Sequence, residues 1–211
     1  IGCVALRQTR LSRTVASRND DLEQVIAANM DTLAIVAAIT KPVLHPGILD
    51  RYLIAAQLGY LSPFIILNKL DEATEPESDA AAHLVQIYSA LGIAVMLLSA
   101  TSGEGMTQLR EQLRGHRTIF AGHSGVGKTS IVNALLRQEV GRTGSLSKKY
   151  RKGAHTTVGA TYLPIPDLPA SYLVDTPGVR EFANYDLDPD QLKFFFPEFE
   201  PLMGQCRITN C

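Results

Sequence analysis

Apolar and polar positions alternate along the chain in blocks whose periods predict strands and helices. Short apolar runs predict buried strands at residues 33–39 and 63–67, and further strands are predicted at 93–98 and 118–121. Apolar residues at helical spacing predict helices near residues 48–58, 78–91, 105–114 and 128–137. Strands that alternate with helices form a mainly parallel sheet with helices on both faces, because right-handed crossovers place them there. The pattern therefore predicts an α/β fold.

The alternation of predicted strands and helices is interrupted in three places. Residues 1–20 are polar with short β-prone pieces, which fit either two short strands or the end of a preceding small β-domain. Residues 138–157 contain three glycines and the run Lys-Lys-Tyr-Arg-Lys (148–152), and predict a long mobile loop. Two strands are predicted after it, near 160–165 and 171–174. The last stretch predicts a short helix followed by a small appended element.

Composition and charge narrow the class of protein. With 45% hydrophobic residues, the chain of 211 residues can bury a core, and its net charge of −1 gives no global positive field for nucleic acid. No apolar run approaches the roughly 20 residues of a membrane-spanning helix, and no signal peptide is visible. Three cysteines make a poor disulfide framework. We therefore expect a cytoplasmic protein without a membrane partner, and a fragment, because the chain does not begin with Met.

Residues 122–129, Gly-His-Ser-Gly-Val-Gly-Lys-Thr, match the phosphate-loop pattern G-x-x-x-x-G-K-[ST] between a predicted strand and a predicted helix. Backbone N–H groups of such a loop wrap the phosphates, and the helix N-terminus adds a favourable dipole. Lys128 would reach the β- and γ-phosphates, and the Thr129 hydroxyl would ligate Mg²⁺. An ordinary glycine-rich turn is the alternative. The nucleotide-binding residues predicted here are Gly122, Ser124, Gly125, Val126, Gly127, Lys128, Thr129 and Ser130.

A carboxylate for the Mg²⁺ side is predicted where a later strand ends. Asp175 begins the tetrapeptide Asp-Thr-Pro-Gly at the carboxyl end of that strand, where ligands bind in open α/β sheets. The N–H of Gly178 could donate to a γ-phosphate. The tetrapeptide alone is a weak signal, because Pro-Gly turns after strands are common.

Two other strand ends carry residues suited to reading guanine. In Asn-Lys-Leu-Asp, the Asp71 carboxylate can accept hydrogen bonds from guanine N1–H and N2–H₂, which adenine does not present. Asn68 can face O6 and N7, and the Lys69 stem can lie over the base and ribose. Ser99 and Ala100 end the next strand, where the Ala100 N–H could support O6. A chance tetrapeptide on a surface turn is the alternative.

The order of these motifs is unusual for a GTP-binding protein. The guanine motif precedes the phosphate loop, whereas it ordinarily follows it. Moving the two guanine loops behind Asp-Thr-Pro-Gly restores the ordinary order, and the ends of a domain often lie close enough to be rejoined. The sequence therefore predicts a circularly permuted P-loop GTPase fold with GTP or GDP and Mg²⁺ as its ligands.

Four segments make the pattern more specific. They are Gly-Ala-His-Thr-Thr (153–157), Asp-Thr-Pro-Gly-Val-Arg-Glu-Phe (175–182), Pro-Glu-Phe (197–199) and Cys-Arg-Ile-Thr-Asn-Cys (206–211). With the permuted order, they resemble the ribosome small subunit-dependent GTPase A family over nearly the whole chain, from residue 26 onward. The resemblance implies a Mg²⁺-dependent GTPase that binds the small (30S) ribosomal subunit and its rRNA, and couples GTP hydrolysis to late maturation. We expect it to be a monomer.

The resemblance also implies three parts. Residues 1–25 would be the tail of an N-terminal OB-fold that is mostly absent, residues 26–185 the permuted GTPase domain, and residues 186–211 the start of a C-terminal zinc-binding extension. Cys206 and Cys211 match the start of the family's zinc motif, but two cysteines cannot complete a tetrahedral site. Zinc is therefore expected in the intact protein. Two incidental buried thiols are the alternative.

The group that positions water is not at its usual place. Val179 follows Asp-Thr-Pro-Gly where Ras-like GTPases usually have Gln, and valine cannot hydrogen-bond to water. The sequence therefore predicts slow intrinsic hydrolysis. His155 is the candidate catalytic residue, and the resemblance points to the same position, although a solvated loop histidine is the alternative. One of Thr156 and Thr157, preferably Thr156, is expected to reach Mg²⁺ and the γ-phosphate.

Two other interpretations stay open. In a nucleotide-gated ribosome- or RNA-binding module, turnover would be incidental, and Val179 in place of Gln favours this interpretation. A P-loop ATPase or kinase would require the guanine motif to be accidental. Stimulation of GTP turnover by small subunits would distinguish a coupled GTPase from the binding module. A preference for guanine over adenine nucleotides would distinguish a GTPase from an ATPase or kinase.

Overall fold

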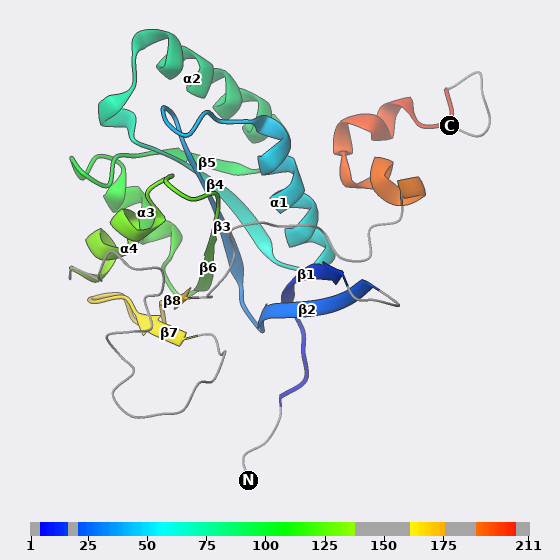
Figure 1. Cartoon of the computed structure of the whole chain (residues 1–211), viewed down its shortest axis with the longest axis horizontal. Coiled ribbons are helices and arrows are strands. Elements are labelled where there is room, and N and C mark those ends of the chain that lie inside the picture. The colour runs from blue at the N-terminus through cyan, green and yellow to red at the C-terminus, as the bar shows by residue number, and fades with distance from the viewer. Residues whose placement is uncertain (1–4, 17–20, 138–160, 176–188, 206–211) are drawn as a thin grey trace.

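The computed structural model describes residues 5–16, 21–137, 161–175 and 189–205. Its main sheet has six strands in the order β5-β4-β3-β6-β8-β7 (Figure 1). Every neighbouring pair in this sheet is parallel except β7 and β8. The mainly parallel sheet predicted from the sequence is confirmed. The strands are β3 (Thr32–Ala38), β4 (Ser62–Asn68), β5 (Ala94–Leu97), β6 (Arg117–Ala121), β7 (Thr161–Pro164) and β8 (Tyr172–Asp175).

Helices cover both faces of this sheet, as predicted. Side chains of α1 and α2 pack in one apolar cluster, and those of α3 and α4 pack in a second cluster on the other face (Figure 1). On β3, Leu33 and Ile35 belong to the first cluster, whereas Ala34 and Val36 belong to the second. Both faces of this strand are buried, which explains its unbroken apolar run. The helices are α1 (Pro46–Leu58), α2 (Glu75–Ala90), α3 (Met106–Gln112) and α4 (Lys128–Leu136).

Local sequence signals set the ends of the two helices on the first face. Helix α1 has Pro46 in its first turn and ends at Gly59, whose N–H donates to the Ala55 carbonyl. Helix α2 begins three residues before the predicted start at residue 78. The Glu77 carboxylate accepts hydrogen bonds from the N–H and the hydroxyl of Thr74, and so caps the first turn. That turn is polar, so apolar spacing alone could not find it.

The N-terminal residues form an antiparallel hairpin of β1 (Arg10–Ala16) and β2 (Asp21–Ala28). The hairpin lies against the end of α1, where the Arg10 N–H donates to the Gly59 carbonyl at 2.9 Å. Leu11 is completely buried in the same cluster as α1 and α2. Within residues 1–20 the structure describes one strand, β1, and its partner β2 begins at residue 21 and continues past the predicted domain boundary at residue 25.

The C-terminal stretch contains two 3₁₀ helices, η3 (Pro189–Phe195) and η4 (Pro197–Leu202), where one short helix was predicted. Phe195 and Phe196 line a cavity of about 260 Å³ together with residues of α1 and the end of α2. In this cavity the Tyr88 hydroxyl donates to the Asp50 carboxylate at 2.8 Å. Burial raises the pKa of Tyr88, and the hydrogen bond to Asp50 and the negative charges of Asp50 and Glu198 raise it further. Among the helices described, none is long and apolar enough to span a membrane.

Candidate nucleotide-binding site

The parallel strands bring the predicted loops to one edge of the sheet. Strands β4, β5, β6 and β8 point the same way, so the segments after them and Asp175 lie at their shared carboxyl edge. Strand β3 lies between β4, which leads to the guanine motif, and β6, which leads to the phosphate loop. The motifs that are out of order along the chain are thus neighbours in space, as the sequence predicted.

The phosphate loop, residues 122–129, joins β6 to α4. Gly127 has φ of 94°, and a Cβ atom there would lie 2.2 Å from the Asn68 amide nitrogen, so both conformation and space require glycine. The Lys128 ammonium donates to the carbonyls of Gly122 and His123, which places it across the loop. Thr129 and Ser130 are exposed in the first turn of α4. The exposed hydroxyls and the helix N-terminus suit an anionic ligand.

Asn68 joins the guanine motif to both neighbouring loops. Its side chain is only 2% exposed, and its amide N–H donates to the Val126 carbonyl of the phosphate loop at 2.9 Å. Its amide oxygen accepts from the Ala100 N–H at 3.1 Å. The sequence predicted that Asn68 faces guanine O6 and N7, and that the Ala100 N–H supports O6. In the structure these groups bond to each other and to the phosphate loop, which fixes the position of all three loops.

The segment around Ser99 and Ala100 is itself held rigidly. Ser99 is fully buried, and its hydroxyl oxygen accepts hydrogen bonds from the N–H groups of Thr101 and Ser102 at 3.2 and 2.9 Å. The Leu70 N–H donates to the Leu98 carbonyl, which ties the two guanine loops together through their backbones. The side chain of Ser99 therefore shapes its own turn, and the closeness of the two loops agrees with the sequence prediction.

Lys69 and Asp71 lie at the surface of the guanine motif. Lys69 has φ of 69°, a left-handed turn that leads into the 3₁₀ helix η1 (Leu70–Glu72). Its ammonium donates to the Lys41 carbonyl, in the segment that follows β3. The Asp71 side chain is exposed, where a ligand can reach it. Its carboxylate is therefore accessible for the base contact that the sequence predicts.

The predicted Mg²⁺ ligands can be placed in part. The exposed Thr129 is the second residue of α4, and Asp175 ends β8, next to the strand that leads into the phosphate loop. A hydroxyl and a carboxylate are oxygen ligands of the kind that Mg²⁺ prefers. Within the part of the chain that is described, no group of three or more His, Cys, Asp or Glu side chains could hold a metal ion. The predicted residues His155, Thr156, Thr157, Gly178, Cys206 and Cys211 lie outside the described residues.

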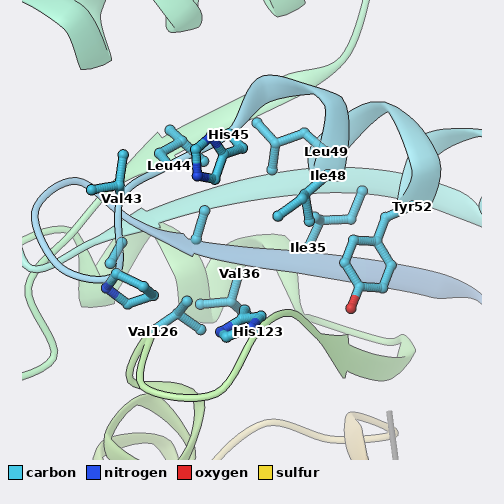
Figure 2. A pocket seen from close by; sticks show the side chains of 13 residues that line it. Ile35, Val36, Val43, Leu44, His45, Ile48, Leu49, Tyr52, His123 and Val126 are labelled. Atoms are coloured by element: carbon cyan, nitrogen blue, oxygen red, sulfur yellow. The ribbon is translucent and has the colours of Figure 1, made fainter. Parts of the chain in front are cut away.

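One feature near the phosphate loop was not predicted. A cavity of about 230 Å³ lies between the phosphate loop, β3 and α1, and its walls are mainly apolar (Figure 2). Tyr52 of α1 and His123 of the phosphate loop both line it. An aromatic residue at helical spacing is ordinarily expected in the core, so the sequence gives no signal that Tyr52 lines a cavity beside the phosphate loop.

Comparison with known proteins assigns this arrangement to a family. A family model described as RsgA GTPase matches residues 4–185. A protein of Pseudomonas putida called small ribosomal subunit biogenesis GTPase RsgA is 37% identical over 211 residues, which are 100% of this chain and 61% of that protein. A protein of the same name from Ectopseudomonas mendocina is 40% identical over 187 residues, which are 88% of this chain and 53% of that protein. The chain thus spans about three fifths of the length of such relatives, or less.

Solved structures support the same fold. The crystal structure of YjeQ from Thermotoga maritima matches with a TM-score of 0.73 and 29% identity, over 100% of this chain and 65% of that one. YloQ, described as a circularly permuted GTPase, matches with a TM-score of 0.67 and 20% identity, over 98% of this chain and 61% of that one. The second likeness concerns the fold alone. The six-stranded sheet described above matches that of circularly permuted GTPases.

Proposed function

Because the chain belongs to the RsgA GTPase family, we propose that it binds GTP with Mg²⁺ and hydrolyses it to GDP and phosphate. The observation that carries the proposal is the position of Asn68. This one buried amide joins the guanine motif, the Ala100 loop and the phosphate loop. A base-reading subsite and a phosphate-reading subsite are therefore parts of one structure, as a purine nucleotide requires.

The proposal gives each group a defined role. Asp71 selects guanine, since its exposed carboxylate can accept from N1–H and N2–H₂ of the base. Lys128 and the N–H groups of the phosphate loop bind the β- and γ-phosphates. Thr129 and Asp175 hold Mg²⁺, which neutralises charge that develops on the phosphates. A hydroxyl and a carboxylate suit that ion, which commonly keeps several of its waters, and Thr156 or Thr157 would add a further oxygen ligand when GTP is bound.

The partner that we propose is the small ribosomal subunit with its rRNA. The relatives from Pseudomonas putida and Ectopseudomonas mendocina carry the name of a small ribosomal subunit biogenesis GTPase. By analogy, this protein would couple hydrolysis to late maturation of that subunit as a cytoplasmic monomer. His155 would position the attacking water and Thr156 or Thr157 would sense the γ-phosphate, because Val179 stands where a glutamine is usual.

We also propose the division of the chain that the resemblance implied. Residues 1–25 would belong to an OB-fold, residues 26–185 to the GTPase domain, and residues 186–211 to a zinc-binding extension. The family model extends from residue 4 to residue 185, so it ends at the second proposed boundary but also covers most of the segment before the first one. Cys206 and Cys211 would supply two zinc ligands, to be completed by other residues of the intact protein.

The decisive experiment measures GTP turnover by the full-length protein as small ribosomal subunits are added. Slow turnover alone and strong stimulation by subunits are expected, with no stimulation of a Lys128→Ala variant. Large ribosomal subunits at equal concentration serve as the control. Failure to bind guanine nucleotide at all would overturn the proposal.

A second candidate function is a nucleotide-gated binding module, and Val179 is the observation that favours it. In that case the subunit would bind more tightly in the presence of a GTP analogue than in the presence of GDP, while turnover would not respond to the subunit. The titration described above separates the two functions, since only the coupled GTPase shows stimulated turnover.

A further inference from the structure

A short segment after β3, residues 40–45, lies between the guanine motif and the phosphate loop, and we call it the strap. Just before it, the Ile39 N–H donates to the Asn68 carbonyl at 2.9 Å, so the strap starts beside the end of β4. It ends at His45, directly before α1. The core thus fixes both ends of the strap, and the contacts in between decide its path.

The guanine motif holds the strap through two side chains. The Lys69 ammonium donates to the Lys41 carbonyl. The Thr40 hydroxyl donates to the Glu72 carboxylate at 3.4 Å, near the outer limit of a hydrogen bond. A charged donor at normal distance forms the stronger bond, so Lys69 is the main anchor of the strap.

On its other side the strap lies against the phosphate loop. A Cβ atom at Gly125 would lie 3.7 Å from Cδ of Pro42, which is ordinary van der Waals contact. Residues 42–45 of the strap line the cavity of about 230 Å³, together with His123 and Val126 of the loop. Figure 2 shows Val43 on the strap and Val126 on the loop, both at the wall of this cavity. The strap is therefore a wall that the phosphate loop meets.

The two contacts of the strap share one rigid group. The Lys41 carbonyl and the Pro42 nitrogen belong to one peptide unit, which is planar, and Cδ of Pro42 is bonded to that nitrogen. A hydrogen bond that fixes the carbonyl oxygen therefore also fixes the Cδ atom that lies against Gly125. Gly125 has φ of 85° and no side chain of its own to hold it, so the loop depends on its neighbours at this point.

We propose that the strap positions the phosphate loop for phosphate binding, and that Lys69 is a positioning residue that holds the strap through the Lys41 carbonyl. This inference rests on the proposed function, because it concerns the phosphate subsite of the same nucleotide site. It gives the Lys69 ammonium a role in addition to the cover that its stem offers to the base. The loop N–H groups can meet phosphate oxygens only where the loop is correctly placed.

Base selection does not depend on the strap. The Asn68 amide oxygen accepts from the Ala100 N–H, and the Asp71 carboxylate is exposed on the other side of the motif from β3. A change in the strap should therefore alter the binding of phosphate groups and leave the binding of the base as it is.

The first test is Lys69→Met, which removes the ammonium but keeps an unbranched apolar stem that can still cover the base. GDP and GTP should bind about fivefold more weakly, as the loss of one hydrogen bond predicts. The inhibition constant of guanosine, which has no phosphate, should stay at the wild-type value. Lys69→Arg keeps a charged donor and should keep most of the GDP affinity.

A double-mutant cycle separates action through the strap from direct contact between the Lys69 ammonium and the nucleotide. Pro42→Ala removes the Cδ atom that lies against Gly125, and should also weaken GDP about fivefold, because breaking either link releases the loop. The double variant should lose no more than either single variant. Direct contact of the ammonium with GDP would instead make the two losses multiply to about 25-fold.

Two matched controls use exposed residues away from the strap. Arg51→Met removes a cation from α1, and Pro169→Ala removes a proline ring from the turn between β7 and β8. Both should leave the affinity for GDP and guanosine unchanged. Urea unfolding of every variant shows whether a loss of affinity reflects a loss of stability. Lys69 bonds at the surface, so Lys69→Met is expected to fold, and its comparison of GDP with guanosine stands without the cycle.

Three results would each overturn the inference and leave the proposed function intact. They are unchanged GDP affinity in Lys69→Met, equal losses for GDP and guanosine, and losses that multiply in the double variant. A wild-type protein that binds no guanine nucleotide would overturn the proposed function, and this inference with it.

Discussion

Asn68 shows how one side chain can take a role that its motif does not state. The motif assigns it to the base, whereas the structure uses its nitrogen and its oxygen to join the Val126 carbonyl to the Ala100 N–H. The two partners are far from Asn68 in the sequence, so no local pattern reveals them. Base reading and phosphate reading become parts of one rigid unit as a result.

The Asn68→Ala variant should therefore lose stability as well as affinity. Truncation leaves the Val126 carbonyl and the Ala100 N–H without their partner, which predicts a loss of about 2 kcal/mol in the free energy of unfolding. Urea unfolding measures this loss. The exposed Gln86→Ala substitution on α2 serves as the control and should change stability by less than about 0.5 kcal/mol. If both variants unfold at the wild-type urea concentration, Asn68 does not hold the loops together.

Asp71 gives a prediction about base selection. The Asp71→Asn variant places an amide N–H group opposite the N1–H and N2–H₂ donors of guanine, so donor faces donor. Xanthine has an oxygen in place of the guanine N2 amino group, and this oxygen can accept from the new amide. GDP affinity should fall about tenfold to a hundredfold, and xanthosine diphosphate should become the preferred ligand. Competition binding of the two diphosphates measures the switch. The exposed Asp79→Asn on α2 should keep the preference for GDP. A variant that still prefers GDP would remove Asp71 from the base site.

At the scale of elements, an ion pair joins the starts of β3 and β6 at the edge opposite the nucleotide site. The Arg117 guanidinium donates to both carboxylate oxygens of Asp31, at 2.6 and 3.0 Å, and the Arg117 N–H donates at 2.7 Å. These hydrogen bonds lower the pKa of Asp31 below its ordinary value, against the opposing effect of burial. The charged carboxylate is thus favoured in the folded state.

The pair predicts a definite dependence of stability on pH. Because the folded pKa of Asp31 is lowered, its contribution is present above the unfolded pKa, near 4, and is lost as pH falls toward the folded pKa. The side chains are 31% and 43% exposed, so solvent screening limits the effect to about 1 kcal/mol. Urea unfolding from pH 6 to pH 3 should show a shallower decline for Asp31→Asn than for wild type, with GDP affinity at pH 7 unchanged. Parallel declines would contradict the assignment.

The elements differ in how far the sequence could predict them. Strands β3 and β4 were predictable, because helices on both faces make their central positions apolar. The start of α2 was missed, because its first turn depends on the polar cap of Thr74 and Glu77. The position of the loops followed from parallel strand ends. The place of Tyr52 in the wall of the cavity beside the phosphate loop could not be predicted, since it depends on how α1 lies on β3.

For the whole molecule, the permuted order changes the connections but not the arrangement in space. The N-terminal hairpin and the C-terminal 3₁₀ helices both lie against α1, the same helix whose Tyr52 lines the cavity beside the phosphate loop. Leu11 of the hairpin belongs to the apolar cluster that contains β3, β4, α1 and α2. Elements that share one core are expected to unfold together.

Guanine nucleotide should therefore stabilise the chain as one cooperative unit. GDP with Mg²⁺ at about a hundred times its dissociation constant adds about 2.7 kcal/mol to the free energy of unfolding, which raises Tm by about 5–10 °C. Circular dichroism on heating should show one transition that moves with GDP. ATP at the same concentration should leave Tm unchanged, because Asp71 has no donor pair to bind on adenine. Chelation of Mg²⁺ should reduce the shift by GDP if Thr129 and Asp175 hold the ion. An equal shift with ATP would instead favour a P-loop ATPase, and a second transition that does not respond to GDP would show that the terminal elements unfold independently of the nucleotide site.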